Sequence, residues 1–255
     1  MNILNGIFLF LFGSVLASFL NLCVFRIEKN DSIKGLFVGR SFCDSCRKSL
    51  KGYELIPIFS FLFLKGKCSS CGSSISVFNL ISELFLAITF LLFFLFQVPY
   101  PLFVLLILLY FFAVYDFHYR SIPKSITDII LILSFFYWFT FLLLDYDVSR
   151  LYPVLLVLFF WFLLFLFSHK KTLFGLGDIL LLFIFAFWLE MELFLLVLFL
   201  SFLVGGVFSL FLVIKDRTYL KKYIPFIPFL LVGFILACLS HYSSLKLFDY
   251  IFAIW

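Results

Sequence analysis

Eight long apolar runs, separated by polar loops, leave this 255-residue chain few possible folds. A helix of about 20 apolar residues crosses the ~30 Å hydrocarbon core of a bilayer. Because 65% of the residues are hydrophobic and 13% are charged, the composition argues against a soluble, a disordered or a nucleic-acid-binding protein. We therefore predict an all-α polytopic membrane protein with about eight transmembrane helices. The expected spans are 3–25, 77–98, 102–115, 126–144, 151–168, 173–189, 193–214 and 224–239.

The basic residues predict how these spans are oriented. Of the nineteen Lys and Arg residues, seventeen lie in the alternate loops 26–76, 116–125, 169–172 and 215–223. Cytoplasmic loops of membrane proteins carry an excess of Lys and Arg, so we expect these four loops in the cytoplasm and both termini outside. No Lys or Arg precedes Arg26, and a signal peptide would begin with a basic stretch. The first span is therefore expected to be a retained helix.

The largest loop carries four of the six cysteines. Cys43 and Cys46 form one CxxC pair, and Cys68 and Cys71 form a second pair after 21 intervening residues. Two such pairs suit a tetrahedral zinc site with four thiolate ligands, and metal binding would stabilise a loop too small for a core of its own. Two disulfides, free thiols or another thiolate-bound metal are the alternatives, although a reducing cytoplasm disfavours disulfides.

Two acidic residues lie where a membrane helix should begin or end. Asp116 follows the span 102–115, and Asp178 stands early in the span 173–189, just after Gly175 and Gly177. Acids within spans are costly and are often functional, and these two are expected at similar depths near the cytoplasmic side. The alternatives are that Asp116 pairs with Arg120 and that Asp178 caps a helix.

Paired carboxylates in a site of low dielectric constant favour hydrolysis by activated water, because one stays protonated while the other acts as a base. The chain has no nucleophilic serine motif, metalloprotease motif or nucleotide-binding loop. The residues therefore predict aspartic hydrolysis within the membrane. A proton-coupled transporter that uses the same acids is the alternative.

An ordered series of motifs resembles the type IV prepilin leader peptidases, which are bacterial GxGD membrane aspartic proteases. The series runs almost from end to end of the chain. Its members are the stretch 17–26 (ASFLNLCVFR), the two CxxC pairs, Leu55-Ile-Pro-Ile58, Gly66-Lys-Cys68, Ile81-Ser-Glu83-Leu84, Asp116 before Ile122-Pro123, Gly175-Leu176-Gly177-Asp178, and Pro225-Phe-Ile-Pro228-Phe.

The resemblance implies a bifunctional enzyme of the bacterial cytoplasmic (inner) membrane. Such enzymes remove the basic leader of type IV prepilins and pseudopilins at the cytoplasmic face, in pilus assembly or protein secretion. They then methylate the new N-terminus with S-adenosylmethionine, an activity linked to the cysteine loop. The resemblance assigns catalysis to Asp116 and Asp178, with support from Gly175 and Gly177, and assigns metal binding to the four cysteines. No nucleic-acid partner is expected.

Three parts follow from this interpretation. We expect a first transmembrane helix over 1–25, a zinc-binding cytoplasmic loop over 26–76 and a membrane-embedded aspartic peptidase domain over 77–255. Two positions depart from the family pattern: Lys124 stands where the family often has an acid, and Leu180 where it often has a lysine. Glu83 matches a family position, but its role does not follow from the sequence.

Overall fold

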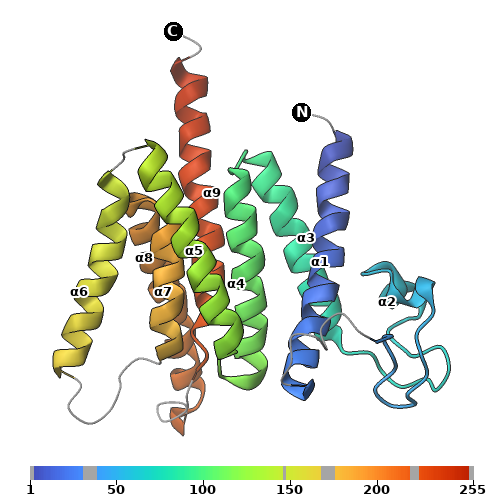
Figure 1. Ribbon diagram of the computed structural model, residues 1–255. Helices are drawn as coiled ribbons and strands as arrows, with labels where there is room; N and C mark the ends of the chain where they lie inside the picture. The colour runs from blue at the N-terminus through green and yellow to red at the C-terminus, as the bar shows by residue number, and fades with distance from the viewer. Residues whose placement is uncertain (1–2, 31–38, 146–147, 168–175, 219–223, 253–255) are drawn as a thin grey trace. The chain divides into compact units, whose positions relative to one another are not determined.

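The chain is helical almost throughout in a computed structural model, which describes residues 3–30, 39–145, 148–167, 176–218 and 224–252 (Figure 1). Within these ranges the regular elements are helices, and two isolated β-bridges pair Phe42 with Ser49 and Lys67 with Ser74. The predicted all-α fold is confirmed. The helices are α1 (Ile3–Asn30), the 3-10 turn η2 (Gly52–Leu55), α2 (Phe59–Phe63), α3 (Val77–Leu95), α4 (Tyr100–Tyr119), α5 (Lys124–Asp145), the 3-10 turn η3 (Val148–Arg150), α6 (Leu151–Phe167), α7 (Leu176–Trp188), α8 (Met191–Lys215) and α9 (Ile227–Phe252).

Five of the described helices are long and apolar enough to cross a membrane. They are α1, α3, α4, α5 and α8, and shorter apolar helices lie at 148–163, 177–188 and 227–243. The chain is thus a multi-pass membrane protein, while the count of eight spans stays a prediction. Helix α9 begins at Ile227, after Pro225, and continues to Phe252, well beyond the expected end of the last span at residue 239.

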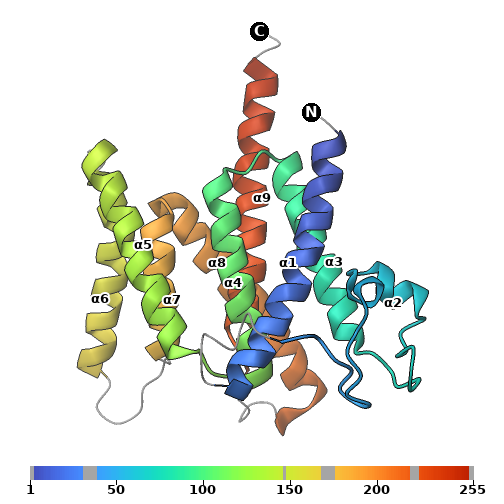
Figure 2. The same cartoon turned by 45° about the vertical axis from the view of Figure 1, so that its right-hand side comes forward.

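The chain divides into two compact units, one up to Val98 and one from Pro99 onward. The first unit contains α1 and α3, which lie side by side in Figures 1 and 2. Gly13 allows their close approach, because a Cβ atom there would lie 3.0 Å from the Ala87 Cα. The Asn21 side-chain amide also donates to the Ser82 hydroxyl at 2.8 Å. Small residues and interhelical hydrogen bonds are the usual means of joining helices in a membrane.

The second unit contains α4 to α9. Helix α4 packs against α9, α9 against α8, and α5 against α7. Gly233 of α9 faces Ser201 of α8 so closely that a Cβ atom at residue 233 would lie 2.6 Å from the Ser201 backbone nitrogen. Helix α4 ends where Arg120 adopts a left-handed conformation. The turn that follows leads through Ile122 and Pro123 into α5, and it brings the ends of α4, α5 and α7 around one cavity.

The expected parts 1–25, 26–76 and 77–255 stay predictions. The two compact units reflect how the chain packs, whereas the expected parts reflect its motifs.

Candidate active site and metal centre

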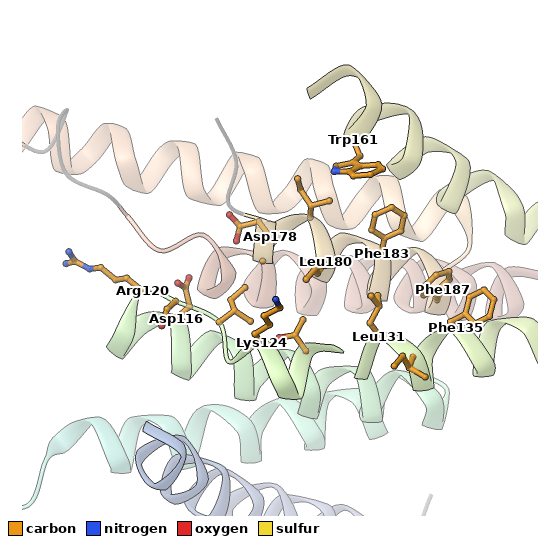
Figure 3. A pocket seen from close by; sticks show the side chains of 16 residues that line it. Asp116, Arg120, Lys124, Leu131, Phe135, Trp161, Asp178, Leu180, Phe183 and Phe187 are labelled. Atoms are coloured by element: carbon orange, nitrogen blue, oxygen red, sulfur yellow. The ribbon is translucent and has the colours of Figure 1, made fainter. Parts of the chain in front are cut away.

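Asp116 and Asp178 line the same cavity in the second unit, although they come from different helices. The cavity has a volume of about 870 Å³ and is lined by α4, α5, α6 and α7 and by the turn at Ile122. Figure 3 shows both carboxylates at one end, with Phe135 and Phe187 at the other. The structure therefore brings together the two acids that the sequence singled out.

Asp116 stands in the last turn of α4 and is only 4% exposed. Its Oδ2 accepts a hydrogen bond of 3.2 Å from the backbone N–H of Ile227. Figure 3 shows the Arg120 side chain extending away from the Asp116 carboxylate. The hydrogen bond that the structure shows for this acid thus comes from a backbone amide and not from Arg120, whose side chain was the alternative partner.

Ile227 is the residue that sequence reasoning missed. It is the first residue of α9 and is fully buried. The first N–H groups of a helix have no partner within it, so they can donate to a carboxylate. Ile227 lies within the motif Pro225-Phe-Ile-Pro228-Phe. This motif places the N-terminal end of α9 against Asp116.

Asp178 lies in the first turn of α7, two residues after the helix begins, and is partly exposed. Gly177 allows α7 to approach the turn after α4, because a Cβ atom at residue 177 would lie 2.5 Å from Ile122 Cδ1 and 3.3 Å from Ile122 Cβ. This contact joins the GxGD motif to the Ile122-Pro123 motif. Gly175 lies outside the described residues.

The rest of the cavity is mostly apolar. Its walls include Leu131, Trp161 and Phe183, and both departures from the family pattern, Lys124 and Leu180, also line it. Figure 3 shows this apolar part leading away from the aspartates. Such a cavity can hold an extended apolar chain while two carboxylates meet it at one end.

The four cysteines of the first unit form a compact cluster. Their Sγ atoms all lie within 4.8 Å of one another, and those of Cys43 and Cys71 are 3.9 Å apart. A tetrahedral zinc ion with Zn–S distances of about 2.3 Å holds its sulfurs about 3.8 Å apart, so the cluster fits this metal. The cluster also brings together the two pairs that are distant in sequence.

The two CxxC turns have the same backbone structure. Cys43 N–H donates to Lys48 O at 2.9 Å, and Cys68 N–H donates to Ser73 O at 2.8 Å. The residue after each pair, Arg47 or Gly72, has a positive φ angle. Backbone N–H groups of Cys46 and Ser45, together with the Ser73 hydroxyl, lower the pKa of the Cys43 thiol to about 6. Metals bind the thiolate, so the lowered pKa suits Cys43 as a ligand, whereas contacts with the neighbouring thiols raise the pKa of Cys46 to about 11.

Two family models match the chain. The bacterial peptidase A24 N-terminal domain matches residues 11–97, and the type IV leader peptidase family matches residues 103–210. Each model matches part of one compact unit, and together they include the four cysteines and both aspartates.

Curated relatives carry the name prepilin leader peptidase/N-methyltransferase. The Bacillus subtilis protein is 42% identical over 122 residues, which are 46% of this chain and 48% of the relative. The Vibrio cholerae protein is 33% identical over 143 residues, covering 51% of this chain and 56% of the relative. The chain thus spans about half the length of these curated relatives. No solved structure matches it. On the two family models and these relatives, the chain belongs to the type IV leader peptidase family.

Proposed function

We propose that this chain removes the basic leader peptide of type IV prepilins or pseudopilins, with Asp116 and Asp178 as its catalytic residues. The observation that carries the proposal is that both carboxylates, from α4 and α7, line one cavity in a member of this family. The relatives are named as prepilin leader peptidases, which supports the same class of substrate.

The proposed reaction divides the work between the two acids. One ionised carboxylate takes a proton from water as its oxygen attacks the carbonyl carbon of the scissile bond. The other carboxyl, which is protonated, donates a hydrogen bond to the carbonyl oxygen. The C–N bond then breaks, and the first carboxyl gives the proton that it took from water to the leaving amine. The Ile227 N–H holds the Asp116 carboxylate in one orientation, and the apolar walls around Trp161 and Phe183 would hold an apolar segment of the substrate.

The second proposed activity is methylation of the new N-terminus. The relatives are also named as N-methyltransferases, and S-adenosylmethionine would supply the methyl group to the amine. A second cavity, of about 520 Å³, lies in the first unit. Its cationic side chains Arg26, Arg40 and Lys51 suit the carboxylate of that donor. Cys43, Cys46, Cys68 and Cys71 would hold a structural zinc ion that orders the loop.

The proposed location is the bacterial inner membrane, with the cysteine loop and the aspartates toward the cytoplasm. This orientation rests on the seventeen basic residues in alternate loops. It places both activities on the side where a basic leader remains after its apolar segment has entered the membrane.

Cleavage of a prepilin in lipid vesicles tests the catalytic pair. The Asp116→Asn and Asp178→Asn variants keep the size of each side chain but cannot act as a base, so each should lose cleavage by about 10³-fold or more. The control is Asp128→Asn, which changes an acid that does not line the cavity. Retained cleavage in either catalytic variant would sink the assigned pair. A wild-type protein without any cleavage would favour the transporter alternative.

A further inference from the structure

A short segment of the cysteine loop is apolar and exposed, although the loop around it is polar. Across the segment 55–63, the exposed fractions are 46% for Leu55, 49% for Ile56, 45% for Phe59, 60% for Leu62 and 82% for Phe63. The last three belong to helix α2. A contiguous apolar surface of this kind is a common mark of an interaction site.

The segment is a built element with defined turns at both ends. At its start, Phe59 N–H donates to Pro57 O at 2.6 Å around Ile58, whose φ of 63° and ψ of −56° describe a γ-turn. At its end, Gly66 N–H donates to Phe61 O at 2.9 Å. A Cβ atom at residue 66 would lie 2.9 Å from the Phe61 ring. A β-branched residue rarely adopts a positive φ, so the surroundings of Ile58 must hold it there.

Glu83 provides that hold. Its Oε2 accepts a hydrogen bond of 2.7 Å from the Ile58 N–H, and both residues are buried. Glu83 stands six residues after Val77, where α3 begins. At 1.5 Å per residue, the start of α2 is therefore fixed about 9 Å along the membrane helix from its first residue.

The position of the Ile58–Glu83 hydrogen bond along α3 indicates what covers the apolar surface of residues 55–63. In Figures 1 and 2, α2 lies level with the first part of α3 and not beyond the end at which α3 begins. Because α3 is long and apolar enough to cross a membrane, an element beside it at that depth would meet lipid. Lys51, Lys65 and Lys67 are exposed on either side of the apolar segment and suit lipid phosphates.

We propose that the segment 55–63 dips into the boundary between the headgroups and the acyl chains of the membrane, and that Glu83 fixes its depth. The partner is the lipid leaflet itself, with anionic headgroups beside the flanking lysines. This contact would hold the cysteine cluster at the membrane surface. The inference does not depend on the proposed peptidase activity, because it concerns the first unit and requires no substrate.

Photo-cross-linking of the full-length protein in vesicles of phosphatidylethanolamine and phosphatidylglycerol tests the inference. Benzoylphenylalanine replaces Phe63 in one variant and Phe42 in a control, since Phe42 is a 40% exposed aromatic residue of the same loop that lies under Arg47. After irradiation, mass spectrometry should find lipid adducts at residue 63 and none at residue 42. Adducts to a second copy of the chain or to its own residues, or no adduct at residue 63, would overturn the proposal, as would equal lipid labelling at both positions.

A matched pair of variants tests the role of Glu83. Glu83→Gln keeps an acceptor oxygen for the Ile58 N–H, whereas Glu83→Leu keeps the bulk but offers no acceptor. Lipid adducts at residue 63 should persist in the first variant and be lost in the second. Zinc content, measured on both proteins, shows that the loop has folded. Unchanged lipid labelling in a folded Glu83→Leu protein would refute the anchoring role while leaving the lipid contact itself to the first experiment.

Discussion

The carboxylate of Asp116 meets a backbone amide from a helix that begins 111 residues later in the chain. The cost of placing acids in spans, their similar expected depth and the resemblance to a family together predicted that Asp116 and Asp178 are the catalytic residues. The partner of Asp116 could not be predicted, because every residue except proline has a backbone N–H and no side-chain signal marks the one that is used. The buried first turn of α9 provides this donor.

Replacing Ile227 by proline tests the contribution of that amide. Proline lacks an N–H but is accepted at the first position of a helix, so α9 should still form. A hydrogen bond to a charged group contributes about 1.5–3 kcal/mol, so the cleavage rate should fall about ten- to a hundredfold. Ile227→Ala loses the same side chain but keeps the N–H, and it serves as the control. Equal cleavage by the two variants would contradict the role of the amide.

Glu54 is a second residue whose role emerges only in the folded loop. Its carboxylate accepts the Lys51 N–H at 2.7 Å and also the Ser69 hydroxyl. These bonds, in that order, lower the pKa of Glu54 below its ordinary value of 4.5. They join the turn η2 to the second CxxC pair.

The stability that Glu54 provides should therefore depend on pH. The unfolded chain binds a proton on this residue at a higher pH than the folded chain does, so its contribution is present above pH 4.5 and is lost as the pH falls through the folded-state pKa. Thermal unfolding of the wild type and of Glu54→Gln should differ most near neutral pH and converge in acid. A difference that is independent of pH would show that the charge has no part in the stability.

At the scale of elements, the cavity depends on how closely the start of α7 approaches the turn after α4. The sequence places a glycine at residue 177, but the neighbour that requires it is Ile122, 55 residues earlier. Helix bounds within about four residues followed from hydropathy for α3, α4, α5 and α8. The pairs of helices that pack together did not follow from hydropathy, because all of these helices are predominantly apolar.

Gly177→Ala should reduce cleavage more than stability. The added Cβ atom displaces Ile122 Cδ1, which is the end of a flexible side chain, yet Ile122 lines the cavity beside both aspartates. We expect about a tenfold lower kcat/KM, since small misplacements at an active site are costly. Ile122→Val removes the Cδ1 atom and should restore cleavage in the double variant. Failure of that rescue, or full activity of Gly177→Ala, would contradict the contact.

At the scale of the whole molecule, the two candidate sites belong to different units. All four clustered cysteines lie before Val98, and every residue that lines the aspartate cavity lies after Pro99. The two sites therefore share no residue. Metal binding in the first unit and cleavage in the second should be separable.

Removing the metal should thus affect one activity only. Cys43→Ser should release bound zinc and, with the loop disordered, lose methylation of the mature N-terminus, seen by mass spectrometry as the missing increment of one methyl group. The prepilin should still be cleaved, within about twofold of the wild-type rate, because separate sites act nearly independently. Cys238→Ser, which alters a cysteine outside the cluster, is the control. Unchanged zinc content would refute the four-thiolate site, and loss of cleavage would refute the separation.

The sequence by itself determined that lipid surrounds most of the chain, that the fold is all-α, and which acids and thiols are available for catalysis and metal binding. Apolar runs require lipid, scarce charges indicate orientation and candidate acids, and two CxxC pairs indicate a metal. Tertiary structure decided which groups meet: the Ile227 amide on Asp116, Ile122 on Gly177 and Ile58 on Glu83. The physical reason is that composition and spacing report how one residue interacts with its solvent, whereas a site depends on short contacts between segments that only packing brings together.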